Sequence, residues 1–413
     1  MRTQIILIIL LLGSVGSISA QQRDSTTIPS DSAAAARADS LQLVRELEEL
    51  LGAGEGETEL TAASPTGPIN PRMLPDISVV GDLVADLSPD GSTLEGAERF
   101  AVREVEVALQ AVVDPYFRAG VFLGFSDAEG AAVEQAKLTT TALPYGLQAT
   151  LGRFLMPVGK LNNSHRHSLH TVDFPHVVQQ FLGEEGLKGT GVEISRIFAP
   201  FGFYQELLVT AVDGLGESEE GLVTERPANR RLKGLGYSAR LRNYVDISES
   251  SNIEISTSVL TGLTARPLAL PIGDINAANA RQSVVGADLT FRWRPLREGL
   301  YESFLLRAEY LYQFNDDDVQ FAPALTDRGG AYIFARYQLT RRLFLGSRLD
   351  WVQAAVPAGD DTRAASAYLE FYPSEFSKLL ATYERLSPAF SDPVNRLIFQ
   401  ATFAIGPHKP HPF

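Results

Sequence analysis

The chain has 413 residues, a net charge of −14 and no cysteine, and 45% of its residues are hydrophobic. The lack of cysteine excludes a disulfide framework and attachment of a lipid at a cysteine, and the acidic balance argues against nucleic acid as a partner. After the first twenty residues there is no apolar run of about 18 residues, so the sequence predicts no transmembrane helix there.

The first segment has the pattern of a secretory signal peptide. Arg2 gives the positive start, Ile5–Leu12 is an unbroken apolar run, and small residues lead to Ala20. We expect cleavage after Ala20, which assigns residues 1–20 to the signal peptide. A membrane anchor is the alternative, but this run is far shorter than the about 20 residues that an anchor needs.

Residues 21–75 are predicted to form a polar periplasmic segment with one short helix. Asp31 can cap a helix that runs to Leu51 and ends at Gly52, and residues 54–75 form a linker rich in Gly, Pro and Thr. Apolar residues follow one face of the helix, which is either a cover for apolar surface or a short coiled coil that joins chains.

From residue 76 to residue 406 the apolar pattern changes to a period of two. In one such stretch Val285, Leu289 and Phe291 alternate with Asp288 and Arg292. Segments of about 10 residues with one apolar and one polar face are typical of the strands of a transmembrane barrel. We predict about sixteen strands, beginning near Asp76, Phe100, Tyr116, Val133, Leu147, Thr190, Tyr204, Leu235, Ile253, Gln282, Ser303, Ala331, Phe344, Ala364, Leu379 and Arg396.

The connections favour a barrel over a soluble sandwich, whose strands alternate in the same way. Short turns follow the even-numbered strands and longer polar loops follow the odd ones, as in an up-and-down barrel with short periplasmic turns. Aromatic residues beside the short turns, such as Tyr116, Tyr145 and Phe201, indicate an interfacial girdle. The predicted fold is therefore all-β: a transmembrane antiparallel up-and-down β-barrel of about sixteen strands, preceded by the short periplasmic helix.

The longest connection, residues 156–188, lies between the fifth and sixth predicted strands. Structureless loops of more than about 12–15 residues are usually functional or disordered. Its apolar residues are Leu161, Phe174, Val177, Val178, Phe181 and Leu182. A loop with so many apolar residues is expected to fold against a surface, and inside a barrel that surface is the lumen.

The strand number and this long loop resemble bacterial porins, whose third outer loop folds inward and narrows the channel. Val113–Ala119, Phe181–Leu187 and Gly406–Phe413 resemble more narrowly a porin-like group whose members are often labelled phosphate-selective-porin-like or zinc-regulated outer-membrane receptors. The chain departs from the usual barrel ending, because Phe413 follows a Pro/His tail (407–413) beyond Ile405, and either Phe403 or Phe413 is the assembly signal.

The resemblance implies a channel in the outer membrane of a Gram-negative-type bacterium, for passive uptake of small hydrophilic solutes or ions. It further implies the lipid bilayer and the barrel-assembly machinery as partners, and it allows a monomer or a homo-oligomer. Charge that lines a constriction sets ion selectivity. The predicted pore-lining residues are Arg240, Arg242, Arg292, Arg294, Arg307, Glu184 and Glu185.

On the predicted inward faces, acidic residues come early in the chain and arginines come late. Because sequential strands are neighbours in such a barrel, this order predicts an acidic wall opposite a basic one. The alternative is a set of ion pairs within the lumen, such as Arg307 with Glu309 or Arg348 with Asp350.

All six histidines lie in the long loop or in the tail. His165, His167, His170 and Asp173 are predicted to form a weak site for Zn²⁺, which would make the chain a metal-binding receptor without a plug domain. The spacing matches no closed structural zinc motif. That favours the alternative, a polar loop whose histidines bond to backbone or water, with no cofactor.

The sequence does not predict an enzyme. An outer-membrane hydrolase needs a Ser–His arrangement held on a rigid wall, and only Ser164 and Ser168 lie beside histidines, in a loop. No Gly-rich phosphate loop, CxxC or HExxH occurs. Residues 21–75 are too few for the plug domain of a TonB-dependent transporter.

Overall fold

The computed structural model describes residues 75–94, 98–126, 130–213, 215, 232–264, 267–270, 273–276, 280–314, 326–356 and 359–406. The chain divides into two compact units, Met1–Pro68 and Ile69–Phe413, and every described residue belongs to the second. The predicted signal peptide, the helix over 31–51 and the tail with Phe413 lie outside the described residues.

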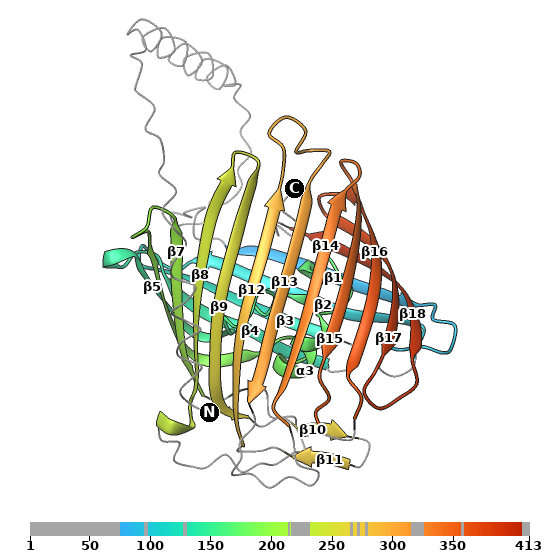
Figure 1. Cartoon of the computed structure of the whole chain (residues 1–413). Coiled ribbons are helices and arrows are strands. Elements are labelled where there is room, and N and C mark those ends of the chain that lie inside the picture. The colour runs from blue at the N-terminus through green and yellow to red at the C-terminus, as the bar shows by residue number, and fades with distance from the viewer. Residues whose placement is uncertain are drawn as a thin grey trace, which may run out of the picture. The chain divides into compact units, whose positions relative to one another are not determined.

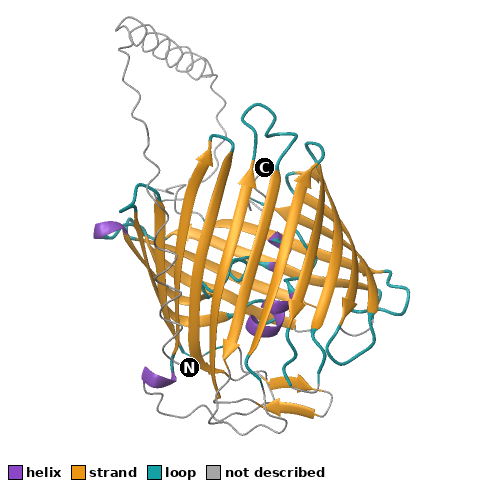
Figure 2. Cartoon of the chain, viewed as in Figure 1, coloured by secondary structure: helices purple, strands orange, loops and turns teal. Residues whose placement is uncertain are grey.

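Sixteen strands form a closed antiparallel barrel (Figures 1 and 2). They are β1 (Asp76–Asp86), β2 (Phe100–Val112), β3 (Phe117–Ser126), β4 (Gly130–Thr140), β5 (Leu147–Leu155), β6 (Lys188–Phe198), β7 (Tyr204–Val212), β8 (Gly236–Ser248), β9 (Ser251–Thr264), β12 (Ala280–Trp293), β13 (Phe304–Phe314), β14 (Arg328–Gln338), β15 (Leu343–Val352), β16 (Thr362–Ser374), β17 (Ser377–Ser387) and β18 (Val394–Ile405). A separate hairpin of β10 (Pro267–Leu270) and β11 (Gly273–Asn276) lies in the connection from β9 to β12.

Each barrel strand pairs with the barrel strands before and after it, and β1 closes the barrel against β18. Across this seam Gly81 lies opposite Phe403. A Cβ atom at position 81 would overlap the Phe403 ring, so any other residue there would have to displace that ring. Closure leaves no unpaired strand edge, which a sheet in a bilayer cannot tolerate.

The predicted fold class is confirmed, and every predicted strand start lies within three residues of the observed one. The largest differences are at Val133 and Ala331, where the strands begin at Gly130 and Arg328. The short–long alternation of connections has three exceptions: residues 127–129 join β3 to β4, residues 294–303 join β12 to β13, and residues 388–393 join β17 to β18. Gly130, with φ of +79°, takes the left-handed backbone that a tight reversal after β3 uses.

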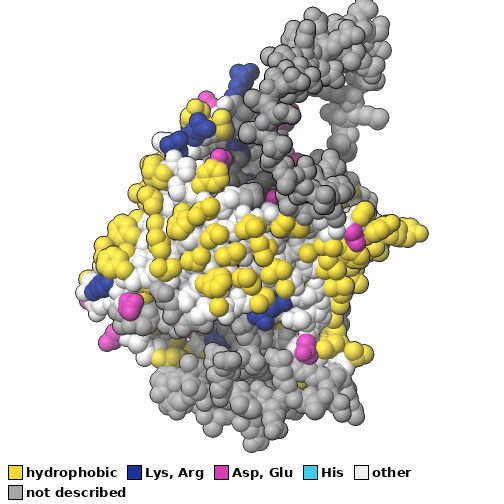
Figure 3. Space-filling view, turned by 180° about the vertical axis from the view of Figure 1, so that it is seen from behind, with side chains coloured by type: hydrophobic (Ala, Val, Ile, Leu, Met, Phe, Trp, Pro, Cys, Tyr) yellow, Lys and Arg dark blue, Asp and Glu magenta, His cyan; other side chains and the backbone are white. Residues whose placement is uncertain are grey.

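The barrel strands bury polar side chains and expose apolar ones, which is the reverse of a sheet in a soluble protein. On β16 the buried face carries Ser366, Tyr368 and Glu370, whereas the exposed face carries Leu369 and Phe371. Apolar side chains cover the outer face of the barrel wall in Figure 3, with charged side chains toward its two ends. Polar residues inside and an apolar belt outside are the arrangement of a barrel that spans a membrane.

Aromatic side chains cluster at the end of the barrel that carries the short turns. Tyr116, Tyr145 and Phe201 are exposed there by 68%, 82% and 76%. Rings at this level suit the membrane–water interface. Among the described residues, no helix combines the length and the apolarity that crossing a bilayer requires.

The main buried apolar cluster lies inside the barrel. It joins residues of the connection between β5 and β6, such as Phe174 and Phe181, to inward-facing strand residues such as Val284, Leu311 and Tyr368. The long apolar side chains of that connection are packed inside the barrel as they would be in the core of a soluble domain.

Candidate functional site

The connection between β5 and β6, residues Met156–Leu187, is here called the lumen loop. One buried residue, Asn162, holds its two ends together. The Asn162 side-chain amide donates to the backbone oxygens of Met156 (2.7 Å) and Leu187 (3.0 Å), and its oxygen accepts from the Leu187 N–H (2.6 Å). The loop therefore leaves the wall as a closed neck.

Beyond the neck the lumen loop contains one 3₁₀ turn, Arg166–Ser168, and one helix, α3 (His176–Leu182). α3 begins after Pro175 and ends at Gly183, whose φ of 114° favours glycine. Val177, Val178 and Phe181 on this helix are at most 1% exposed and belong to the apolar cluster. The inward folding expected from the loop's apolar residues is thus observed.

Polar side chains of the wall fasten the lumen loop along β12, β14 and β15. The Gln282 amide donates to the backbone oxygen of Phe181 (3.0 Å), and the backbone N–H of His176 donates to Asp350 Oδ1 (3.0 Å). Arg328 donates to Gln180 Oε1 at 3.1 Å. The bonds to Phe181 and His176 satisfy loop backbone that the lumen would otherwise leave unpaired.

A buried lysine fastens the other side of the loop. Lys378 on β17 is 0% exposed, and its ammonium donates to the backbone oxygens of His167 (2.9 Å) and Leu169 (2.8 Å). Hydrogen bonds from a charged donor are stronger than neutral ones. This residue was not among those that the sequence singled out.

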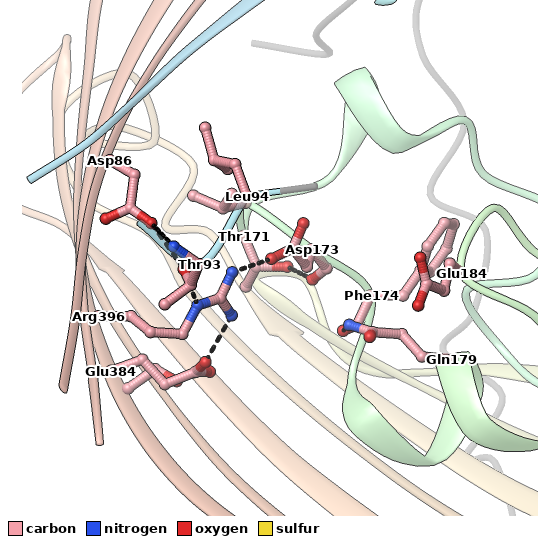
Figure 4. A network of polar contacts seen from close by, with 12 residues as sticks. Asp86, Thr93, Leu94, Thr171, Asp173, Phe174, Gln179, Glu184, Glu384 and Arg396 are labelled. Carbon is pink, nitrogen blue, oxygen red and sulfur yellow. Dashed lines mark hydrogen bonds and ion pairs between the residues drawn. The ribbon is translucent and has the colours of Figure 1, made fainter. Parts of the chain in front are cut away.

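Asp173 of the lumen loop lies between two arginines of the wall, and Figure 4 shows one of them, Arg396, together with Glu384. Arg396 Nη2 donates to Asp173 Oδ2 (3.1 Å), and Arg103 Nη1 donates to Asp173 Oδ1 (3.0 Å). Arg396 also pairs with Glu384 at 2.8 Å and donates to Thr93 Oγ1 at 3.0 Å. Burial by itself raises the pKa of Asp173, but Arg396 and Arg103 outweigh it and hold that pKa below its usual value.

The start of the loop is fixed by a second group of charges. Lys160 Nζ pairs with Glu254 Oε2 at 2.7 Å, and Arg240 donates to the backbone oxygen of Gly159 and to Asp288 Oδ2 (2.9 Å). Burial lowers the pKa of Lys160 to about 8, although Glu254 favours its charged form. Lys160 is therefore a lumen cation that titrates close to neutral pH.

The predicted pore-lining arginines have different surroundings. Arg240 is 3% exposed and donates a hydrogen bond to the backbone oxygen of Gly159. The side chains of Arg242 and Arg292 are 36% and 39% exposed. Arg294 lies in the turn after β12 and donates to the backbone oxygen of Gly299 (2.8 Å). Arg307 faces a small hollow inside the barrel.

The two predicted glutamates lie at the end of the lumen loop. Glu184 is exposed, and its backbone oxygen accepts from Arg166. Glu185 pairs with Lys188 at 3.0 Å and with Arg166 at 3.7 Å. Burial raises the pKa of Glu185, but Lys188 and Arg166 more than offset this and lower it. Pore lining by these seven residues stays a prediction.

The expected separation into an acidic and a basic wall is wrong. On the strands from β12 onward arginines alternate with carboxylates, as in the pairs of Arg336 with Glu370 (2.8 Å) and Arg396 with Glu384 (2.8 Å). The Arg348–Asp350 pair is confirmed at 2.6 Å, whereas Arg307 forms no ion pair with Glu309 within the described residues. The reason is that a buried charge needs an opposite charge within reach, on the same strand or on one nearby.

The structure directs the four residues of the predicted zinc site to different parts of the wall. His165 Nδ1 lies 2.6 Å from Glu106 Oε2, and His170 Nδ1 lies 3.5 Å from Glu370 Oε2. His167 is buried against the His165 ring, and Asp173 is held by arginines. No group of three or more His, Asp or Glu is placed to hold a metal ion within the described part of the chain. Zinc binding stays a prediction that requires these side chains to move.

The loop histidines face wall carboxylates instead. Besides His165 and His170, His176 Nε2 lies 3.7 Å from Glu384 Oε2. Burial and Arg336 lower the pKa of His170 to about 4, with Glu370 opposing them. Of the two serines beside histidines, Ser168 donates its hydroxyl to the backbone oxygen of His165 (2.7 Å).

Two hollows flank the lumen loop. One lies against β2 and β4 and is lined by charged residues that include Glu104, Glu134 and Lys188. The other lies against β13, β14 and β15 and is lined by Arg307, Tyr332 and Phe334 among others.

Comparisons with known proteins agree with this architecture. No family model matches the chain. An uncharacterized protein of Aquifex aeolicus (strain VF5) is 29% identical over 339 residues, which cover 76% of this chain and 70% of that protein. A high-pH structure of Pseudomonas putida OprB matches with a TM-score of 0.53 at 11% identity, and the match covers 80% of this chain and 94% of the OprB chain.

Outer-membrane expressed OmpT of Vibrio cholerae gives a TM-score of 0.51 at 9% identity, over 84% of this chain and 100% of that one. At such identities the likeness shows the fold. The predicted resemblance is thereby confirmed as far as the porin-type 16-strand barrel. The narrower phosphate-selective-like or zinc-receptor-like group stays a prediction.

Proposed function

We propose that the chain is a porin-like channel of the outer membrane, in which the lumen loop sets the size of the passage for small hydrophilic solutes or ions. The observation that carries the proposal is the fastening of this loop across the barrel. Arg103 on β2, Lys378 on β17 and Arg240 on β8 each bond to it from a different part of the wall. A loop held in this way narrows the lumen at a fixed size.

The passage itself lies beside the loop, along the wall that its apolar residues leave free. Inward-facing charged side chains remain partly exposed there, notably Lys137, Glu193, Arg242 and Arg292. Water and hydrated solutes suit a lining of this kind, whereas an apolar constriction would exclude them. We assign the pore-lining role first to Arg242 and Arg292, since Arg240 and Arg294 are occupied by backbone oxygens.

The remaining features of the channel follow from the same proposal. The signal peptide, residues 1–20, would direct export, and the barrel-assembly machinery would insert the barrel into the outer membrane. The apolar belt would contact the lipid bilayer or a second copy of the chain in a homo-oligomer. None of the described residues supplies a specific reason to prefer a zinc receptor or a hydrolase.

Single-channel recording in planar bilayers tests the proposal. Deleting residues 165–180 removes most of the lumen loop and should raise the conductance and admit larger solutes. Leu369→Ala, at a residue 45% exposed on the outer face of β16, is the control and should leave the conductance unchanged. Equal conductance of the folded deletion variant and this control would contradict the constriction, and no conductance in the full-length protein would contradict the channel.

A further inference from the structure

The carboxylate of Glu254, on β9, meets cations from three neighbouring elements. Its Oε2 lies 2.7 Å from Lys160 Nζ of the lumen loop and 3.7 Å from Arg292 Nη1 of β12. Its Oε1 accepts a hydrogen bond from Arg242 Nε of β8 at 3.3 Å. Each arginine lies two residues along its strand from the residue opposite Glu254, so the register makes both of them diagonal neighbours of this carboxylate.

The cations and carboxylates of this cluster differ in what they present to the lumen. The side chains of Arg242 and Arg292 are 36% and 39% exposed, whereas that of Glu254 is 3% exposed. Glu206 on β7, which pairs with Arg242 at 2.6 Å, is 13% exposed. A solute beside this wall therefore meets guanidinium groups more than the carboxylates that pair with them. Charges that line a passage set its ion selectivity.

The backbone of the lumen loop at Lys160 is fixed by groups other than Glu254. The backbone N–H of Gly159 donates to Ser258 Oγ (3.1 Å), and that of Lys160 donates to Glu309 Oε1 (3.1 Å). The Lys160 side chain is 12% exposed. Glu254 thus neutralises an ammonium group that the loop backbone holds in a largely buried place, where a charge without a partner is unfavourable.

Other charged side chains surround Lys160 without replacing Glu254. Asp288 pairs with Arg240 at 2.9 Å, and Glu309 is bonded to the loop backbone. Within the described part of the chain, Glu254 is the carboxylate that pairs with the Lys160 ammonium. The remaining charged groups near Lys160 on the adjoining strands are Arg240, Arg242, Asp288, Arg292, Arg307 and Glu309.

We propose that Glu254 is the positioning residue that sets the charge of the passage, as the counter-ion shared by the lumen loop and by two arginines of the wall. It keeps the Lys160 ammonium charged and holds Arg242 and Arg292 beside the passage. These three cations share two carboxylates, Glu254 and Glu206, which leaves one positive charge in excess. The proposal rests on the channel function, because only a conducting passage has an ion selectivity.

The pH dependence of ion selectivity tests this role, with reversal potentials of the full-length channel measured in planar bilayers under a KCl gradient. Burial lowers the pKa of Lys160 to about 8, and Glu254 opposes this shift. The anion-to-cation permeability ratio of the unaltered channel should therefore fall with a midpoint near that value. Since an opposite charge within about 4–6 Å moves a pKa by about 1–3 pH units, the midpoint should be at least about one pH unit lower in Glu254→Gln.

Glu206→Gln is the matched control. It removes the same charge and a partner of Arg242, but among the described residues Glu206 forms no pair with Lys160. Its midpoint should therefore equal that of the unaltered channel. Glu254→Asp keeps the charge and withdraws the carboxylate by one methylene, so its midpoint should also fall, by less than in Glu254→Gln. This second variant covers the case that Glu254→Gln does not fold.

An unchanged midpoint in either folded Glu254 variant, or an equal fall in Glu206→Gln, would overturn the proposal. A midpoint raised toward about 10.4, the usual value for lysine in water, would overturn it too, because the substitution would then have released the loop side chain into solvent. No conductance in the unaltered protein would refute the channel and this role together. Conductance with a selectivity that does not change with pH would refute this role alone.

Discussion

Replacing Phe174 by alanine should release the lumen loop from the barrel interior. Phe174 is 0% exposed and belongs to the apolar cluster that joins the loop to the wall. Truncating a fully buried phenylalanine costs about 3–5 kcal/mol. The substitution destabilises the docked loop by this amount and leaves the undocked loop unaffected. Since about 1.4 kcal/mol corresponds to a factor of ten, the population of the undocked loop should rise about 100-fold to a few thousand-fold.

Trypsin cleavage measures that population. Lys160 and Arg166 are cleavage sites inside the loop, and a protease reaches them only when the loop leaves the lumen. When the loop recloses faster than it is cut, the cleavage rate follows the open population. The Phe174→Ala protein in detergent micelles should therefore be cut at these sites at least 100-fold faster, by the lower limit of the same estimate.

Phe399→Ala is the matched control for this experiment. Phe399 lies on β18 and is 43% exposed on the outer face, so the same truncation there leaves the loop contacts intact. Heat-modifiable migration on gels verifies that both barrels are folded. Equal cleavage rates at Lys160 and Arg166 in the two folded variants would refute the reasoning.

Three further predictions concern charges of the lumen loop. Because the pKa of Lys160 is about 8, the lumen loses one positive charge as pH rises through that value. The anion-to-cation permeability ratio should therefore fall between pH 7 and pH 9. The Lys160→Met channel should show no such change. The pKa of His170 is about 4 in the docked loop and 6.5 when the residue is free, so the undocked loop binds more protons between pH 4 and pH 6.5. Docking therefore weakens as pH falls from 6.5 toward 4. Trypsin cleavage of the loop should rise over this pH range in the unaltered protein but not in His170→Gln. Lys378→Met removes two charged hydrogen bonds to loop carbonyls, each of which contributes about 1.5–3 kcal/mol, so cleavage should rise about 100-fold or more. An unchanged cleavage rate would contradict the role of Lys378.

The barrel could be predicted because the alternation of polar and apolar residues that specifies it lies within single strands. Alternation on β16, from Ser366 to Tyr372, repeats within one strand and needs no knowledge of its neighbours. The same holds for the Arg348–Asp350 pair, whose members are two residues apart on one face. The inward folding of the lumen loop was predictable from Phe174 and its apolar neighbours, since a loop with so many apolar side chains folds against a surface and the lumen is the surface that the inside of a barrel provides.

The contacts of the site depend on register, which the sequence does not reveal. Arg336 meets Glu370 across β15, and Arg396 meets Glu384 only once β17 and β18 are aligned. The places of the histidines depend on the fold of the loop in a related way. Their spacing suggested one cluster, but the 3₁₀ turn at Arg166–Ser168 sends His165 toward β2 while His170 faces β16.

A single introduced cysteine tests most directly whether the lumen loop lines the passage. The chain has no cysteine, so Ser164→Cys in the loop offers one thiol, and Leu369→Cys, 45% exposed on the outer face, is its control. A charged methanethiosulfonate reagent added during single-channel recording should lower the conductance of Ser164→Cys in one step and leave Leu369→Cys unchanged. Unchanged conductance of a Ser164→Cys channel that mass spectrometry shows to be modified would contradict a passage set by this loop.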